Sequence, residues 1–193
     1  QFREFIQPVE LTRLMCSLAE LEPNARVFNP FAGLASFEVY LDQSHEYVGQ
    51  ELNPQTWALG ALRLMAYKKL VTSKYMNEDS VTNWPVETGT LFSKPKEEFN
   101  LIISTPPFES TIGFSYNGKR TLVQYLIERG INSLGQNSKL ITLLPHRFFY
   151  RDEQDKRLRK QLIDRDLVDT IISLPNGILP NTNIPLDILV LSR

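Results

Sequence analysis

The sequence predicts an α/β fold, with a mostly parallel sheet that carries helices on both faces. Apolar runs of strand length alternate along the chain with longer segments whose apolar residues recur at helical spacing. The final apolar run follows its predecessor without an intervening helix, so we expect it to enter the sheet antiparallel. A chain of 193 residues, of which 42% are hydrophobic, can bury a sizeable core, and we expect residues 1–193 to form one domain.

The first predicted unit is a helix at 9–21 followed by a strand at 25–30. Apolar residues recur at helical spacing around Cys16, which favours a core position for this cysteine. A short helix is expected at 36–41, directly after a turn of small residues. We therefore expect the strand at 25–30 to lead through a tight turn into the short helix at 36–41.

The second predicted unit is a strand at 46–51 and a long helix at 54–70. Asn53 is a typical N-cap residue, and Pro54 suits the first helical position because it has no N–H to leave unpaired. A short strand at 75–80 is expected to follow. The unit is therefore predicted to add two more strands and one covering helix.

The middle of the chain begins with a strand at 99–104, which is rich in β-branched residues. A loop that contains Gly113 and Gly118 is expected next. A helix at 121–134 and an apolar strand at 139–145 complete this unit. Two prolines follow the first of these strands at once, which predicts a rigid turn at its end.

The last predicted unit begins with a strongly charged helix at 152–166, whose alternating charges are typical of a solvated face. A strand at 168–175 follows it. The closing strand at 187–193 comes after a segment without helical pattern, and it is the strand expected to run antiparallel. This unit completes a predicted sheet of seven strands.

Composition excludes several classes of protein. The net charge of −1 is too small for a general nucleic-acid binder, so any role on DNA must be local or shared with a partner. The single cysteine excludes a disulfide framework and fits a reducing compartment such as the cytoplasm. No apolar run approaches the roughly 20 residues that span a bilayer, so no membrane partner is expected. His45 and His146 are too scattered to suggest a metal site.

Candidate ligand-binding residues follow the ends of the predicted strands, where open α/β sheets bind ligands. The stretch 29-NPFAGLAS-36 places Gly33 in a turn before a helix start, although an ordinary turn between strand and helix would look the same. Glu51 ends the next strand, where a carboxylate could accept hydrogen bonds from a ribose diol, or could simply lie on the surface. Asp79 could hold an exocyclic amine or cap a turn.

The fourth candidate is the turn 105-TPPF-108. Its prolines fix the backbone, its polar groups could hold an amine, and Phe108 could stack on a flat ring. A plain Pro-Pro turn is the structural alternative. Its position after a strand, like that of the other candidates, favours a binding role.

Together these stretches resemble the adenine-N6 DNA methyltransferases that use S-adenosyl-L-methionine, most closely the modification subunit of type I restriction-modification systems. The stretches that carry the resemblance are QFREFIQPVELTRLM, VFNPFAGLASFEVYL, YVGQELNPQTWALGALRL, IISTPPF and NGILPNTNIPLDILVLS. The resemblance covers nearly the whole chain. It implies a Rossmann-like, S-adenosylmethionine-dependent methyltransferase fold with a mostly parallel seven-stranded sheet, and the abrupt chain ends suggest a piece of a longer protein.

The resemblance also implies a site. Glu51 would bind the cofactor ribose, the backbone around Gly33 would cradle its methionine part, and Asp79 would hold its adenine amine. Pro106 and Phe108 would receive a flipped adenine of DNA. The implied cofactor-binding residues are Gln7, Pro8, Asn29, Pro30, Phe31, Ala32, Gly33, Glu51, Leu52, Asp79 and Ser80. The implied catalytic residues are Thr105, Pro106, Pro107 and Phe108, and no metal is needed. The implied partners are DNA, a separate DNA-specificity subunit and, as a further candidate, a restriction subunit.

The chain departs from the family pattern at Gln7, Asn29, Ala35 and Thr105, where the family usually has Thr, Asp, Gly and Asn or Asp. Thr105 keeps a hydroxyl acceptor but lacks a side-chain carbonyl. Three alternatives therefore stay open: an active adenine-N6 methyltransferase, a degenerate module that binds cofactor or partners without transferring a methyl group, and a methyltransferase for RNA or protein glutamine.

Overall fold

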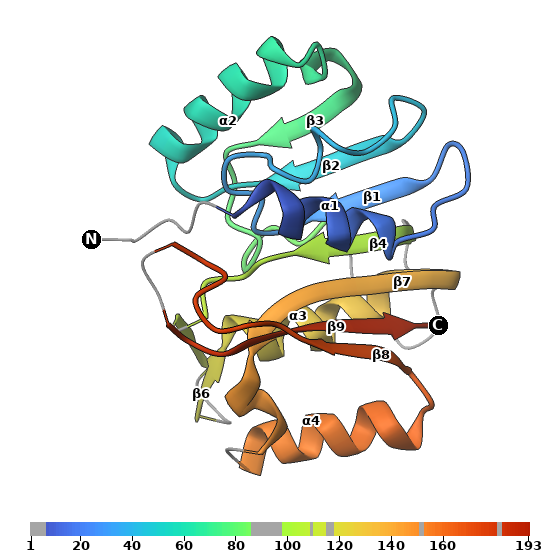
Figure 1. Cartoon of the computed structure of the whole chain (residues 1–193), viewed down its shortest axis with the longest axis vertical. Coiled ribbons are helices and arrows are strands. Elements are labelled where there is room, and N and C mark those ends of the chain that lie inside the picture. The colour runs from blue at the N-terminus through green and yellow to red at the C-terminus, as the bar shows by residue number, and fades with distance from the viewer. Residues whose placement is uncertain (1–6, 86–97, 109, 115–117, 151–152, 181–182) are drawn as a thin grey trace.

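The computed structural model describes residues 7–85, 98–108, 110–114, 118–150, 153–180 and 183–193 (Figure 1). A seven-stranded sheet in the order β3-β2-β1-β4-β7-β9-β8 forms its centre. The strands are β1 Arg26–Asn29, β2 Glu46–Gln50, β3 Ser73–Met76, β4 Phe99–Ser104, β7 Leu134–Pro145, β8 Val168–Ser173 and β9 Leu186–Ser192. Pairing is parallel from β3 through to β7, and β9 runs antiparallel to both of its neighbours. The predicted fold class is confirmed, including the antiparallel last strand.

Helices cover both faces of this sheet, as predicted. In Figure 1, α1 crosses in front of β1 and β4 while α3 lies behind β7 and β9. The helices are α1 Val9–Ser17, α2 Pro54–Ala66, α3 Leu122–Ser133 and α4 Glu153–Asp164, with short 3-10 turns at Leu70–Thr72 and His146–Phe149. α1 is shorter than the predicted 9–21, because Glu20 and Asn24 have positive φ angles of 48° and 63°, which no right-handed helix accommodates.

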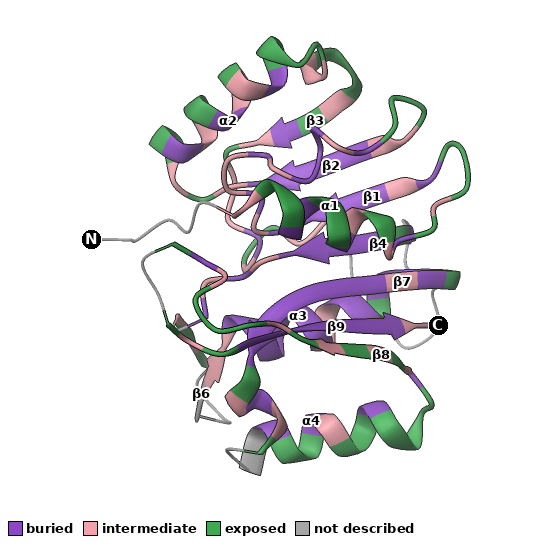
Figure 2. Ribbon diagram, viewed as in Figure 1, coloured by how far each residue is buried: buried purple, intermediate pink, exposed green. Residues whose placement is uncertain are grey.

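The central strands form the core, and the helices turn their outer faces to solvent, although α2 exposes the apolar side chains of Leu59, Leu62 and Met65. Phe28, Leu101 and Ile102 are completely buried in β1 and β4. In Figure 2 the central strands are coloured almost entirely as buried, whereas the outward sides of α2 and α4 are exposed. Burial on both faces is why these parallel strands read as continuous apolar runs in the sequence.

The helix predicted at 54–70 ends at Ala66, and the strand predicted at 139–145 begins at Leu134. Three other predicted elements differ in type or in position. The helix expected at 36–41 is a series of turns, because its aromatic and β-branched residues are weak helix formers and almost all are buried. The strand expected at 75–80 lies at 73–76, where it pairs with β2 only as far as Gln50. Gly113 and Gly118, expected in a loop, lie instead in two antiparallel strands of a β5–β6 hairpin, β5 Thr111–Phe114 and β6 Gly118–Thr121; residues 115–117 lie outside the described residues.

Some predictions fall on parts of the chain outside the described residues. These parts are residues 1–6 of the leading motif, residue 152 at the start of the charged helix, and residues 181–182 before the last strand. Within the described ranges, no helix is both long and apolar enough to cross a membrane. Those ranges also contain no group of His, Cys, Asp or Glu residues that could hold a metal ion. Burial raises the pKa of the Cys16 thiol to about 12, as suits a core cysteine.

A buried carboxyl group at Glu38 makes stability depend on pH. The residue is 1% exposed, and its carboxylate oxygens have no hydrogen-bond partner among the described residues. Burial raises its pKa from 4.5 to about 8. Between these two values the folded chain keeps a proton that the unfolded chain has lost, so the free energy of unfolding falls as the pH rises through this window.

We therefore expect Glu38→Gln to remove part of the pH dependence of stability. Between pH 6 and pH 8 the wild-type free energy of unfolding should fall by about 1–3 kcal/mol more than that of the variant, at about 1.4 kcal/mol per pH unit. Urea titrations at the two pH values measure this difference. Glu46→Gln is the matched control, because Glu46 forms surface ion pairs with Arg26 and Lys74. Equal pH dependence in wild type and Glu38→Gln would show that Glu38 stays ionised in the fold.

Candidate functional site

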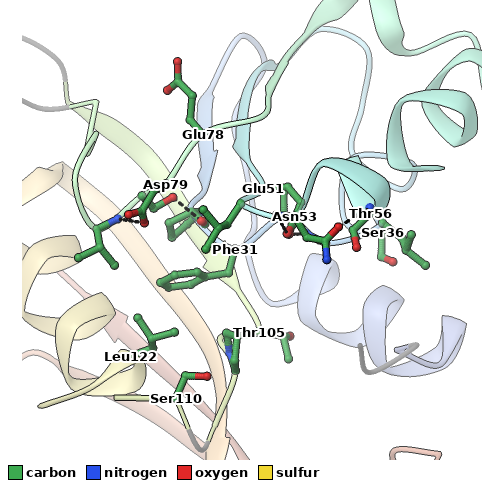
Figure 3. Close-up of a pocket in the computed structure, with 18 of the residues that line it drawn as sticks. Phe31, Ser36, Glu51, Asn53, Thr56, Glu78, Asp79, Thr105, Ser110 and Leu122 are labelled. Atoms are coloured by element: carbon green, nitrogen blue, oxygen red, sulfur yellow. Dashed lines mark hydrogen bonds between the residues drawn. The ribbon is translucent and has the colours of Figure 1, made fainter. Parts of the chain in front are cut away.

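A cavity of about 630 Å³ opens at the carboxyl ends of the first four sheet strands (Figure 3). The chain passes from β1 outward to β2 and β3 and then returns to β4, which pairs with β1 on its other side. Such a reversal of strand order leaves a crevice in which open α/β sheets bind ligands. Loops after all four strands, the β5–β6 hairpin and the start of α3 contribute to the lining. The fold thus brings candidate ligand-binding residues from four separate stretches of the sequence to one cavity.

Most of the predicted site residues line this cavity. They are Gln7, Pro30, Phe31, Ala32, Gly33, Glu51, Leu52, Asp79, Ser80, Thr105 and Pro107. The lining does not include Pro8, Asn29, Pro106 or Phe108. Pro8 instead precedes α1, and its carbonyl oxygen accepts hydrogen bonds from both the N–H and the hydroxyl of Thr12.

Gly33 forms the predicted turn after β1. Its φ of +54° lies in the left-handed region, which favours glycine, and no atom lies within 4 Å of the place where a Cβ would stand. Its N–H donates to Oε2 of Glu51 at 2.9 Å, and its carbonyl accepts from the Tyr75 hydroxyl. Ala35, which stands where the family usually has Gly, is completely buried, packs with Leu64 and Tyr75, and does not line the cavity.

Glu51 connects the glycine turn to the start of α2. Its second oxygen, Oε1, accepts from the N–H of Asn53 at 2.7 Å. Asn53 caps α2 as predicted, with its side chain accepting from the N–H groups of Gln55 and Thr56. Burial raises the pKa of Glu51, and the two backbone N–H donors oppose that rise by stabilising the carboxylate. Both oxygens keep lone pairs with which to accept further hydrogen bonds from a ligand in the cavity.

Asp79 and Ser80 shape the side of the cavity next to β3. Asp79 caps a turn by accepting from the N–H of Val81 at 2.9 Å, and it also lines the cavity. The Ser80 hydroxyl lies within hydrogen-bond distance of the Pro30 carbonyl oxygen and of Oε1 of Gln50. Ser80 is 3% exposed, and its side chain joins the loop after β3 to the loop after β1 and to the end of β2 at the edge of the cavity.

Asn29 lies beneath the cavity and joins β1 to β4. Its Oδ1 accepts from the Ser104 hydroxyl at 2.9 Å and from the N–H of Phe31 at 3.3 Å. The side chain is completely buried, and its Nδ2 has no partner among the described residues. In this arrangement Asn29 supports the turn that carries Phe31 and does not reach the cavity.

The Thr-Pro-Pro-Phe turn divides between the cavity and the core. Thr105 lines the cavity and donates to Oε1 of Gln7 at 2.8 Å. Phe108 is only 2% exposed and belongs to the main hydrophobic core, so stacking on a ligand would require this ring to move. Phe31 is an aromatic side chain that does line the cavity. In the view of Figure 3, Phe31 lies between Asp79 above it and Thr105 below it.

Several lining residues were missed by the sequence analysis. Ser110, Thr111, Ile112 and Leu122 come from the β5–β6 hairpin and the start of α3, which the sequence analysis had taken partly as a glycine loop. Gln50, which is buried and does not line the cavity, was missed as a residue that connects the loops beside it. Its Nε2 donates to Oε2 of Glu78 at 2.9 Å and to the carbonyl of Asn83 at 2.8 Å. The sequence signal for Gln50 was a polar residue at the end of an otherwise apolar predicted strand.

The sequence of this chain matches a known protein family. The sequence model of the N-6 DNA Methylase family matches residues 2–193. The chain belongs to this family. The methylase subunit of the type I restriction enzyme MpnII from Mycoplasma pneumoniae is 25% identical over 166 residues, covering 76% of this chain and 30% of its own length. The HindI methylase subunit from Haemophilus influenzae is 27% identical over 211 residues, covering 98% of this chain and 46% of its own length.

Solved structures of similar fold include further members of restriction-modification systems. A type I methyltransferase subunit from Streptococcus thermophilus superposes with a TM-score of 0.85 at 22% identity, covering 98% of this chain and 45% of that one. A modification subunit of a putative type I enzyme from Vibrio vulnificus gives 0.80 at 18% identity, covering 98% and 44%. This N-6 DNA methylase family member therefore spans less than half the length of these relatives.

Proposed function

We propose that this chain is a methyltransferase domain that uses S-adenosyl-L-methionine to methylate N6 of adenine in DNA, as part of a type I restriction-modification system. One observation carries the proposal: a single cavity at the sheet's switch point joins the glycine turn, the Glu51 carboxylate and the Thr-Pro-Pro turn. Membership of the N-6 DNA Methylase family and the names of the similar subunits support it. We also propose that residues 1–193 form one domain and that the protein acts in the cytoplasm.

The cavity fits S-adenosylmethionine in size and in chemistry. Its volume of about 630 Å³ lies within the range usual for sites of cofactors and small ligands. Glu51 offers free lone pairs to a ribose diol, and Leu52 and Val81 supply apolar surface for an adenine ring. The open space above Gly33 lets the backbone approach a ligand closely. When bound, the cofactor supplies an electrophilic methyl group on sulfur.

The second part of the cavity suits an adenine base. Thr105, Pro107 and the β5–β6 hairpin line it, and the prolines fix the turn so that Thr105 keeps its position. We propose that the Thr105 hydroxyl accepts a hydrogen bond from the adenine amino group and so directs its nitrogen lone pair toward the methyl group. The protein's contribution is then position and electrostatics. The amino group would lose one proton on methylation, and this proton would pass to water.

Target recognition is proposed to involve other protein segments or subunits. The net charge of −1 leaves little excess of basic residues for binding duplex DNA alone. Because the similar proteins are named as methylase subunits of type I restriction enzymes, we propose that a separate DNA-specificity subunit reads the sequence. A restriction subunit is a further candidate partner. The DNA partner itself would enter as a flipped adenine.

The two remaining alternatives differ from the proposed function, one in lacking methyl transfer and the other in its substrate. A degenerate module would bind the cofactor without methyl transfer, which the methylase relatives do not favour. An RNA or glutamine methyltransferase would label another substrate. The decisive assay supplies radiolabelled S-adenosylmethionine to the complete modification complex with duplex DNA, RNA and protein in parallel. Label in N6-methyladenine of duplex DNA is expected, and label elsewhere or none at all would contradict the proposal.

A further inference from the structure

The hydrogen bond between Thr105 and Gln7 joins two positions that depart from the family pattern. The residues are 98 positions apart in sequence, yet the Thr105 hydroxyl donates to Oε1 of Gln7 at 2.8 Å. Both side chains are half-buried, and both line the cavity. The two residues that differ from the family pattern therefore hydrogen-bond to each other, and the effect of either one depends on the other.

The amide of Gln7 is held in one orientation. Its Nε2 donates to the sulfur of Met15 at 3.6 Å, and Met15 is a completely buried residue of α1. The amide oxygen therefore faces Thr105. Because this oxygen can only accept, Thr105 commits its one hydroxyl proton to Gln7 and presents only lone pairs to the cavity.

We propose that Gln7 is a positioning residue for methyl transfer: it orients the Thr105 hydroxyl as an acceptor for the exocyclic amino group of adenine. This inference rests on the proposed function. The amino group donates to Oγ1 of Thr105, which donates to Oε1 of Gln7. A hydroxyl that donates in such a chain is polarised and becomes a stronger acceptor. Neither residue gains a net proton, because the amino proton that is lost after methyl transfer goes to water.

The inference can be tested by base binding, without turnover. The chain is saturated with S-adenosylhomocysteine and titrated by NMR with 9-methyladenine and with 9-methylpurine, which lacks the amino group. The wild type should prefer the adenine by about threefold to tenfold, the effect of one neutral hydrogen bond. Gln7→Leu should bring this ratio close to one, as should Thr105→Val. The double variant should lose nothing further, because the two residues act as one unit.

Controls separate positioning from a structural role. Gln7→Glu keeps an acceptor for Thr105 and should keep the preference, whereas Gln55→Leu, on the exposed start of α2, should change nothing. In the complete complex, Gln7→Leu should lower kcat about tenfold while the KM for the cofactor stays constant, since the Thr105 hydroxyl remains but is no longer held in its orientation. Thermal unfolding of each variant confirms that it is folded.

Each outcome bears on one claim. If Gln7→Leu still prefers 9-methyladenine, Gln7 does not position Thr105. The same conclusion follows if the wild type, saturated with S-adenosylhomocysteine, binds both bases equally. A folded wild type that does not bind S-adenosylhomocysteine would instead overturn the proposed function, and the inference with it. Loss of the preference in Gln7→Leu and its retention in Gln7→Glu would establish the inference.

Discussion

Replacing Thr105 with valine is expected to slow methyl transfer by on the order of 10²–10³, the usual cost of removing a hydrogen-bond partner that acts in the transition state. Valine has nearly the same shape but no hydroxyl, so the cavity should keep its form. Thr105 lines the cavity and holds its hydroxyl toward Gln7, which leaves the oxygen free to accept from a substrate. The affinity for S-adenosylmethionine should therefore be unchanged.

The measurement is single-turnover methylation by the complete modification complex. Thr105→Ser is the matched control, because it retains a hydroxyl and should recover most of the rate. If Thr105→Val transfers methyl groups as fast as the wild type, the amino group of the substrate is held by some other residue.

The second large effect is expected at Glu51. Glu51→Ala should weaken S-adenosylmethionine binding by about a hundredfold or more, because hydrogen bonds to a charged group contribute roughly 1.5–3 kcal/mol each and a ribose offers two hydroxyls. The change also removes the acceptor for the N–H groups of Gly33 and Asn53. The turn after β1 and the start of α2 would then lose the residue that connects them.

Equilibrium dialysis with labelled cofactor measures this loss. Glu46→Ala is the control, since Glu46 begins the same strand at its opposite end and forms ion pairs on the surface. Because burial raises the pKa of Glu51, we also expect affinity to fall with decreasing pH sooner than an ordinary glutamate would predict. An affinity equal to that of wild type in Glu51→Ala would place the ribose elsewhere.

Much of the fold was predictable because buried parallel strands form uninterrupted apolar runs. The strands at 26–29, 46–50 and 99–104 lie within a residue or two of their predicted positions. Their ends also located the cavity, since the carboxyl ends of parallel strands meet at one edge of the sheet. The cap at Asn53 was predictable for a local reason, because Asn is favoured at the N-cap, Pro is favoured at the first helical position, and apolar residues at helical spacing follow them.

The remaining features depend on contacts between distant residues, which one sequence does not reveal. The pairing of Gln7 with Thr105 spans 98 positions, and neither residue alone suggests it. Phe108 follows the Pro-Pro turn as expected, but long-range packing places it in the core. The β5–β6 hairpin was missed because its glycines indicate a loop as readily as a turn between strands.

The central claim is that the cavity at the switch point binds S-adenosylmethionine, and calorimetric titration of that cofactor into the wild-type chain tests it most directly. We expect saturable binding at one site with a dissociation constant on the order of micromolar, or about −8 kcal/mol. Absence of heat at millimolar cofactor, in a chain that still unfolds cooperatively, would contradict the account and indicate a family member that has lost its cofactor site.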